Sequence, residues 1–244
     1  MSLPVFSVER LPAVGSTTLD GPEGKHAATV RRLRVGEELL LSDAQGGMAR
    51  CVVEAAERDS LRLAVSEIWH EPQPELRVRV VQALVKGDRG ELAVELATEA
   101  GVDAVVPWRA SRCVAKWDDG PRGAKALARW RSTAAAAAKQ ARRAWTPEVT
   151  EPVSTKQLAA LIADADAALV LHESATGPLT SADLPASGEV LLVVGPEGGI
   201  ADDELTTLSD AGAQVTRLGR TVLRASTAAA VALGALGAVT TRWS

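Results

Sequence analysis

Residues 189–200 read EVLLVVGPEGGI and decide the fold of the chain, because they join a buried strand to a glycine-rich loop. Residues 190–194 are an unbroken apolar run, which is typical of a strand covered on both faces in a parallel sheet. Gly195, Gly198 and Gly199 follow the run. Glycines at a strand end let the backbone adopt positive φ and approach a ligand, and ligands bind at that edge of open α/β sheets. We therefore expect a ligand loop here.

A second stretch, residues 218–236, repeats this arrangement with the sequence LGRTVLRASTAAAVALGAL. Residues 214–218 predict a strand and residues 219–224 a loop, with Ser226 or Thr227 capping an alanine-rich helix. Two glycine-bearing loops at one sheet edge predict a small-molecule cofactor site. The chain contains neither G-x-G-x-x-G nor G-x-x-x-x-G-K-[ST], so a Rossmann oxidoreductase is disfavoured. The residues alone leave the type of ligand open.

The remainder of the chain predicts two domains, residues 1–72 and 73–244. Short strands interrupted by turn clusters are typical of a small barrel and are expected at residues 5–8, 38–41, 49–55 and 61–68. Residues 24–33 predict a helical turn, and the two prolines of WHEPQP at residues 69–74 indicate a linker. Strands and helices alternate beyond it, which predicts an α/β domain with a largely parallel sheet. We expect strands at 76–83, 103–108 and 167–171, and helices at 91–100, 121–145 and 158–165.

Composition excludes several other classes of protein. No apolar run in the 244 residues reaches the roughly 18 residues that a membrane span needs. The first ten residues, MSLPVFSVER, lack the pattern of a secretory signal. The two cysteines and three histidines form neither a disulfide framework nor a metal motif, so we expect no metal. A soluble, cytoplasmic protein is the expectation.

Positive charge is concentrated in one segment of an acidic chain. The net charge is −4, yet residues 109–143 carry 10 basic and 2 acidic side chains, a local +8. Such a segment predicts a phosphate-binding patch. The alternative is the solvated face of an ordinary helix, but that helix has almost no acidic side chains with which to form i,i+4 pairs. We therefore favour contact with RNA.

GPEGG at residues 195–199, followed by LG-x-x-VLR at residues 218–224, resembles the SPOUT family of methyltransferases. More narrowly, the chain resembles the members that methylate N3 of a uridine in 16S ribosomal RNA of the small ribosomal subunit. The resemblance implies S-adenosylmethionine as cofactor and a trefoil-knotted, parallel-sheet methyltransferase domain. It also implies that a small PUA-like β-barrel domain precedes this domain, and that the protein is a homodimer.

The resemblance further implies which residues form the sites. A loop K-G-x-R at residues 86–89 and a strand that ends in H-x-x-A at residues 172–175 match the family. The implied cofactor-binding residues are Leu171, His172, Glu173, Val194, Gly195, Pro196, Glu197, Gly198, Gly199, Leu218, Gly219, Leu223, Arg224, Ser226 and Thr227. The residues assigned to RNA binding are Lys25, His26, Arg31, Arg32, Arg112, Lys116, Lys139, Gln140, Arg142 and Arg143. Of these, His26, Arg32, Arg112, Lys116, Gln140 and Arg143 match the family pattern, and the others are basic side chains close to them in the sequence. For His26, a structural hydrogen-bonding role is the alternative.

Two residues are the candidates for catalysis. Arg224 directly follows the cofactor loop, where its charge would stabilise a uridine that has lost its N3 proton. Glu197 would act as a base, or else as a carboxylate that stabilises the loop, and the loop role is favoured. N3 lies on the Watson–Crick edge, so the uridine must be unpaired or extruded when it reacts.

The chain departs from the family pattern at two positions. Lys139 stands where the family usually has Glu, and Ser226 stands where VLR-x-E-T-A has Glu. The second departure leaves room for a non-catalytic RNA-binding assembly factor that has kept the fold. A SPOUT enzyme that acts on another nucleotide, such as a tRNA ribose 2′-OH, is the other alternative, although the predicted PUA-like domain argues against it.

Overall fold

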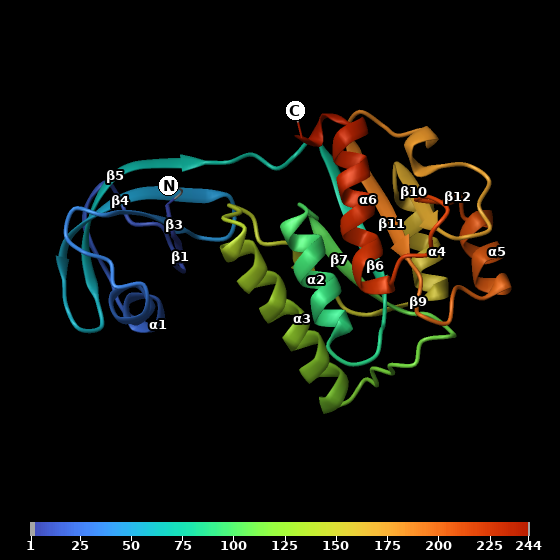
Figure 1. Ribbon diagram of the computed structural model, residues 1–244, viewed down its shortest axis with the longest axis horizontal. Coiled ribbons are helices and arrows are strands. Elements are labelled where there is room, and N and C mark those ends of the chain that lie inside the picture. The colour runs from blue at the N-terminus through green and yellow to red at the C-terminus, as the bar shows by residue number, and fades with distance from the viewer. Residues whose placement is uncertain (1–2, 244) are drawn as a thin grey trace. The chain divides into compact units, whose positions relative to one another are not determined.

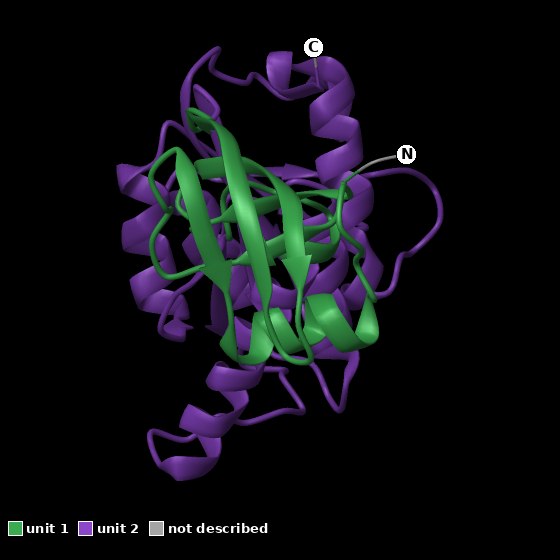
Figure 2. Cartoon of the chain, turned by 90° about the vertical axis from the view of Figure 1, so that its left-hand side faces the viewer, with its two compact units in different colours: residues 1–73, 138–146 green, residues 74–137, 147–244 purple. Residues whose placement is uncertain are grey.

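The computed structural model describes residues 3–243 and divides the chain into two compact units (Figure 2). The first unit consists of the described residues up to Gln73 together with Ala138–Thr146. The second unit consists of Pro74–Ala137 and the described residues from Pro147 onward. The sequence predicted two continuous domains, residues 1–72 and 73–244. It did not predict that residues 138–146 pack with the first unit.

The first unit is built on a five-stranded sheet in the order β1-β3-β4-β5-β2, in which only the pair β1–β3 is parallel (Figure 1). Its strands are β1 (Val5–Ser7), β2 (Gly15–Leu19), β3 (Glu38–Ser42), β4 (Gly47–Ala56) and β5 (Leu61–His70). The helical turn expected at residues 24–33 forms as α1 (Gly21–Lys25) and the π-helix η1 (His26–Val30). The polar sequence GSTTL of β2 gives no strand signal, because β2 is a largely exposed edge strand.

Alternation along β4 and β5 builds the core of this unit. Ala49, Cys51 and Val53 are buried on β4, as are Leu61, Leu63 and Val65 on β5, and Cys51 pairs with Val65 and Val53 with Leu63. The register between the two strands shifts at Arg50/Cys51 and at Val53/Ala55. Such irregularities bend a strand and increase its local twist. The sheet is therefore curved around its own apolar face.

Residues 138–146 are attached to the first unit by backbone hydrogen bonds and by Trp145. The Gly46 amide donates to the Ala144 carbonyl (2.9 Å), and the Thr146 amide donates to the Ala44 carbonyl (3.1 Å). Trp145 Nε1 donates to the Glu71 carbonyl (2.7 Å). Gly46 has φ +93°, and a Cβ there would lie 2.6 Å from both Trp145 Cζ2 and His70 Cε1, so only glycine fits.

The second unit contains an all-parallel, seven-stranded sheet in the order β12-β10-β11-β6-β7-β8, with β9 also paired to β7. Its strands are β6 (Leu76–Ala83), β7 (Ala104–Arg109), β8 (Glu148–Val149), β9 (Val153–Ser154), β10 (Ala167–Leu171), β11 (Gly188–Val194) and β12 (Gln214–Thr216). The sheet confirms the predicted α/β class. Strands β8 and β9 have two residues each, which is too short for any sequence pattern.

Helices cover both faces of this sheet. They are α2 (Arg89–Glu99), α3 (Pro121–Gln140), α4 (Thr155–Asp164), α5 (Asp202–Asp210) and α6 (Ala225–Val239), with 3₁₀ turns η2 (Leu179–Ser181) and η3 (Thr241–Trp243). Figure 1 shows α2 and α6 over one face and α4 and α5 over the other. Among residues 3–243, no helix is long and apolar enough to cross a membrane.

The structure corrects the expected ends of two helices. Helix α3 ends at Gln140 rather than at Trp145, because the chain turns at Arg142, which has a left-handed φ of 58°. Helix α6 begins at Ala225 with Arg224 at the N-cap position, so neither Ser226 nor Thr227 caps it. Ser226 instead lies buried in the first turn, and the Thr227 hydroxyl donates back to the Arg224 carbonyl (3.2 Å).

A buried ion pair secures the C-terminal end of the second unit. Arg242 Nη1 lies 2.7 Å from Asp103 Oδ2, and their side chains are 8% and 14% exposed. The Arg242 guanidinium also donates to the Leu76 and Gly101 carbonyls, while Asp103 Oδ2 accepts from the Val78 amide (2.7 Å). These contacts fasten the segment that follows α6 to the start of β6.

We expect Arg242→Ala to lower the free energy of unfolding of the second unit by about 3 kcal/mol, because removing one partner leaves a buried charge unpaired. Chemical denaturation followed by circular dichroism measures this change. Arg122→Ala is the control, since Arg122 is an exposed arginine on α3. An Arg242→Ala protein as stable as the control would contradict the structural role of the pair.

Candidate cofactor site

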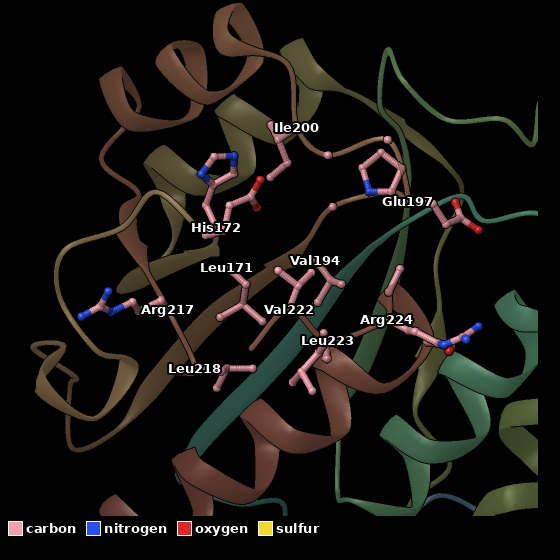
Figure 3. Close-up of a pocket in the computed structure, with 18 of the residues that line it drawn as sticks. Leu171, His172, Val194, Glu197, Ile200, Arg217, Leu218, Val222, Leu223 and Arg224 are labelled. Atoms are coloured by element: carbon pink, nitrogen blue, oxygen red, sulfur yellow. The ribbon is translucent and has the colours of Figure 1, made fainter. Parts of the chain in front are cut away.

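The carboxyl ends of β10, β11 and β12 meet at one edge of the parallel sheet, and the loops that follow them enclose a cavity of about 790 Å³ (Figure 3). This volume is within the range of about 300–1,000 Å³ that is usual for small-molecule sites. The cavity is lined by Val85, Arg89, Arg112, Leu171, His172, Glu173, Val194, Gly195, Pro196, Glu197, Gly198, Gly199, Ile200, Asp202, Arg217, Leu218, Gly219, Arg220, Thr221, Val222, Leu223, Arg224, Ala225, Ser226 and Ala228. All of these residues belong to the second unit.

The glycines of the loop after β11 are required by close packing as much as by backbone conformation. A Cβ on Gly195 would lie 2.8 Å from Ile200 Cγ1, and a Cβ on Gly198 would lie 3.2 Å from Arg112 Cβ. Only Gly199 has positive φ (+73°), and its amide closes a turn by donating to the Pro196 carbonyl (2.9 Å). The loop is therefore a compact turn with little room for side chains beneath it.

The wall of the cavity combines an apolar centre with charged ends. Figure 3 shows Leu171, Val194, Leu218 and Leu223 at the centre of the view, with His172 and Arg217 on one side and Glu197 and Arg224 on the other. The His172 amide donates to the Thr216 carbonyl (2.9 Å), which joins the ends of β10 and β12. Such a wall fits a ligand that has a flat apolar group and polar or charged groups.

The cavity lining contains 14 of the 15 residues that sequence analysis assigned to cofactor binding, and Thr227 is the exception. The sequence reasoning did not select Val85, Arg89, Ile200, Asp202, Arg217, Arg220, Thr221, Val222, Ala225 and Ala228, which also line it. Most of these are immediate neighbours of selected residues, so widening each motif by a few positions would have found them. Val85 and Arg89 follow β6, whose carboxyl end reaches the same edge of the sheet.

Glu197 and Arg224 differ in the hydrogen bonds and ion pairs that their side chains form. Glu197 Oε1 accepts a hydrogen bond from the Lys86 amide (3.3 Å) and lies 4.0 Å from Arg89 Nη1. The Arg224 side chain is exposed and has no hydrogen bond or ion pair with the residues that the structure describes. Glu197 therefore already has a loop-stabilising role, whereas the guanidinium of Arg224 is available to a ligand.

The residues that sequence analysis assigned to RNA contact fall into two groups. Arg112 and Lys116 lie in the second unit, and Arg112 lines the cavity, with its Nη1 3.4 Å from both the Gly198 and Ile200 carbonyls. The others belong to the first unit: Lys25, His26, Arg31, Arg32, Lys139, Gln140, Arg142 and Arg143. Arg112 thus supports the glycine-rich loop in addition to any contact with RNA.

In the first unit, Lys139 and His26 both contact Phe6. Lys139 Nζ lies 5.2 Å from the centre of the Phe6 ring and pairs with Glu23 at 2.6 Å, while the His26 ring stacks edge-on at 5.7 Å. Lys139 is therefore engaged within the protein. The carboxylate of Glu23 balances its charge.

Cysteine thiolates are not available for chemistry in this chain. Burial raises the pKa of the Cys113 thiol to about 11, and it raises the pKa of the Cys51 thiol to about 11 as well. Both thiols are therefore protonated at neutral pH. No group of three or more His, Cys, Asp or Glu side chains within residues 3–243 is arranged to hold a metal ion.

Comparison with known families and proteins agrees with this geometry. Residues 71–237 match the family model of an RNA methyltransferase domain, and residues 19–66 match that of an RNA methyltransferase PUA domain. The ribosomal RNA small subunit methyltransferase E of Mycobacterium bovis is 54% identical over 244 residues, covering 98% of this chain and 93% of the relative.

Solved structures of methyltransferases are also similar to this chain. The ribosomal RNA small subunit methyltransferase E of Neisseria gonorrhoeae, bound to S-adenosyl methionine, superposes with a TM-score of 0.86 at 26% identity and covers 98% of both chains. A Legionella pneumophila protein described as a methyltransferase, in complex with the cofactor SAM, has a TM-score of 0.85 at 28% identity and covers 98% of this chain and 99% of its own. With its family model, its sequence relative and its fold in agreement, the chain belongs to the ribosomal RNA small subunit methyltransferase E family.

Proposed function

We propose that this protein transfers a methyl group from S-adenosylmethionine to N3 of a uridine in 16S ribosomal RNA of the small ribosomal subunit. Membership of the family supports an RNA methyltransferase. The observation that supports this site is the cavity at the carboxyl ends of β10, β11 and β12, where a glycine-rich loop meets Arg224. Arg224 is exposed and has no side-chain partner among residues 3–243. An enzyme of this kind works in the cytoplasm, where ribosomal subunits are assembled.

The cavity fits S-adenosylmethionine, which supplies an activated methyl group when bound. Leu171, Val194, Leu218 and Leu223 would cover the adenine ring, and backbone groups of the loops at residues 195–199 and 218–223 would bind its polar edge. His172, Glu173 and the adjacent charged side chains would hold the polar remainder. Two solved structures of the same fold, 28% and 26% identical to this chain, hold this molecule, which supports the assignment.

Methylation at N3 requires the uracil imide to lose its proton and its charge to be stabilised as the new N–C bond forms. The positive charge of Arg224, directly after the cofactor loop, supplies that stabilisation in our proposal. Both cysteines are buried and neither lines the cavity, so neither thiol is placed to form a covalent intermediate with the RNA. In this proposal the imide proton passes to water, and the remaining task of the site is to align N3 with the methyl group.

We further propose a trefoil knot in the second unit and a PUA-like barrel in the first. Strand β12 lies at the edge of the sheet, yet the helix that follows it, α6, packs on β6 and β11 nearer the centre. The Arg217 amide donates to the Gly177 carbonyl (3.1 Å) and the Arg217 carbonyl accepts from the Leu179 amide (2.9 Å), and residues 177–179 lie in the loop after β10. These features support passage of the chain through that loop. The irregular, bent β4 and the PUA-domain match support the barrel.

We expect a homodimer, since α6 exposes Val231 (47%) and Val239 (48%) two turns apart and therefore on one side of the helix. Light scattering after size-exclusion chromatography should give twice the chain mass of 25.4 kDa. Val231→Glu should shift the protein towards the monomer. A monomeric wild-type protein at micromolar concentration would contradict this part of the proposal.

The decisive experiment is methyl transfer from labelled S-adenosylmethionine to small ribosomal subunits that lack the modification, with the labelled nucleoside identified. We expect N3-methyluridine in 16S ribosomal RNA. Label in a ribose, or in tRNA, would move the function to another nucleotide. No transfer together with no cofactor binding in calorimetry would instead favour a non-catalytic assembly factor, with Ser226 as the residue to replace by Glu.

Arg224→Ala should lower kcat by about 100-fold, the usual cost of removing one group that stabilises an anionic transition state. Arg224→Lys should fall in between, because lysine keeps the charge but lacks the planar fork. Steady-state methylation at saturating cofactor and RNA measures kcat for both variants. An unchanged kcat in Arg224→Ala would exclude this role.

Glu197→Gln is the matched control for that series, because the Gln side-chain carbonyl can still accept the Lys86 amide. We expect activity close to that of the wild type. A loss of about 100-fold or more would show that Glu197 acts as the base rather than as support for the loop.

A further inference from the structure

Glu204 is a buried carboxylate (5% exposed) in the first turn of α5, outside the lining of the cavity. Its Oε1 accepts hydrogen bonds from the Ser111 amide (2.9 Å) and the Thr155 hydroxyl (2.7 Å). Its Oε2 accepts from the Ser111 hydroxyl (2.8 Å) and the Ala201 amide (3.4 Å). Four donors and the N-terminus of a helix therefore stabilise the charge of this carboxylate.

These hydrogen bonds join three segments that are distant in sequence. Ser111 lies in the loop after β7, Thr155 is the first residue of α4, and Ala201 ends the glycine-rich loop after β11. Thr155 is itself fixed, because its hydroxyl accepts from Nε1 of the fully buried Trp108 (3.2 Å). Glu204 thus connects the glycine-rich loop to the rigid core of the sheet.

The connection reaches the cavity from two sides. On one side, Glu204 fixes the Ala201 amide and with it the exit of the loop. On the other, it fixes Ser111, and the next residue, Arg112, packs against Gly198 and directs its Nη1 to the Gly198 and Ile200 carbonyls (3.4 Å each). Residues 195–200 lie between these two contacts and line the cavity.

A carboxylate suits this position better than an amide. The Ser111 and Ala201 amides approach different oxygens of Glu204, and a backbone amide can only donate. Glutamine has a single acceptor oxygen, so its NH₂ group would face one of the two amides. The hydroxyls of Ser111 and Thr155 can rotate and accept instead, which limits the disturbance to one backbone amide.

We propose that Glu204 is a positioning residue that holds the glycine-rich loop in the conformation that binds S-adenosylmethionine. This role rests on the proposed function, since it requires the cavity to be the cofactor site. It adds a buried residue that lies outside the cavity lining and acts through Arg112 and Ala201.

Calorimetric titration of S-adenosylmethionine into the full-length protein tests this role, together with kcat at saturating cofactor. Glu204→Gln should raise the dissociation constant about 10-fold, which corresponds to about 1.4 kcal/mol, and leave kcat unchanged. Thr155→Val removes the hydroxyl that donates to Glu204 and accepts from Trp108, but it leaves both backbone amides paired with Glu204, so it should raise the dissociation constant less. Melting temperatures show whether each variant is folded during the titration.

Asp103→Asn is the control for a general loss of stability. Asp103 also accepts from a backbone amide and pairs with Arg242, but it does not contact the loop. It should lower the melting temperature without changing the dissociation constant. Wild-type affinity in Glu204→Gln, or equal weakening in Asp103→Asn, would overturn the positioning role. Absence of cofactor binding by the wild-type protein would instead overturn the proposed function on which that role rests.

Discussion

The burial of strand β11 is the constraint on which the second unit depends. The strand pairs with β6 along its whole length and with β10 along five residues, and each residue from Val190 to Val194 is at most 2% exposed. A strand enclosed in this way excludes polar side chains, and the chain must turn sharply where the strand ends. The three glycines after it permit that exit, since Gly195 and Gly198 lie directly against Ile200 and Arg112. The shape of the cavity follows from the same crowding.

Buried and half-buried charged side chains then fix the loops and the C-terminal segment, which the hydrogen bonds of the sheet do not hold. Glu204 joins the loops, while Arg242 and Asp103 fasten the C-terminal end. Each group is surrounded by donors or by an opposite charge, so its burial is compensated. The exposed arginines near the cavity, such as Arg220 and Arg224, have no comparable partners among the described residues and form the part of the site that meets solvent.

Sequence patterns predicted the elements of the second unit well where hydrophobic runs were long. Strands β10 and β11 lie within a residue or two of their expected positions because burial on both faces leaves an apolar run, and β6 (LRVRVVQA) was found from its alternation of apolar and polar residues. Strands β2, β8 and β9 carry no such signal, and neither does the early end of α3, where Arg142 adopts a left-handed conformation. The loops of the site could be predicted from their glycines and motifs. The hydrogen bonds around Glu204 could not, because Ser111, Thr155 and Ala201 are distant in sequence and come together only in the folded chain.

The return of residues 138–146 to the first unit has a consequence for biosynthesis. Met48 and Val5 form a small core with Ala144, and Trp145 packs against it. During synthesis from the N-terminus, the strands of the first unit leave the ribosome well before this segment does. Until residue 146 has emerged, Met48 and the backbone groups around Gly46 lack their partners. The first unit is therefore completed only after much of the second has been translated, and a fragment that stops at Gln73 would lack part of its own core.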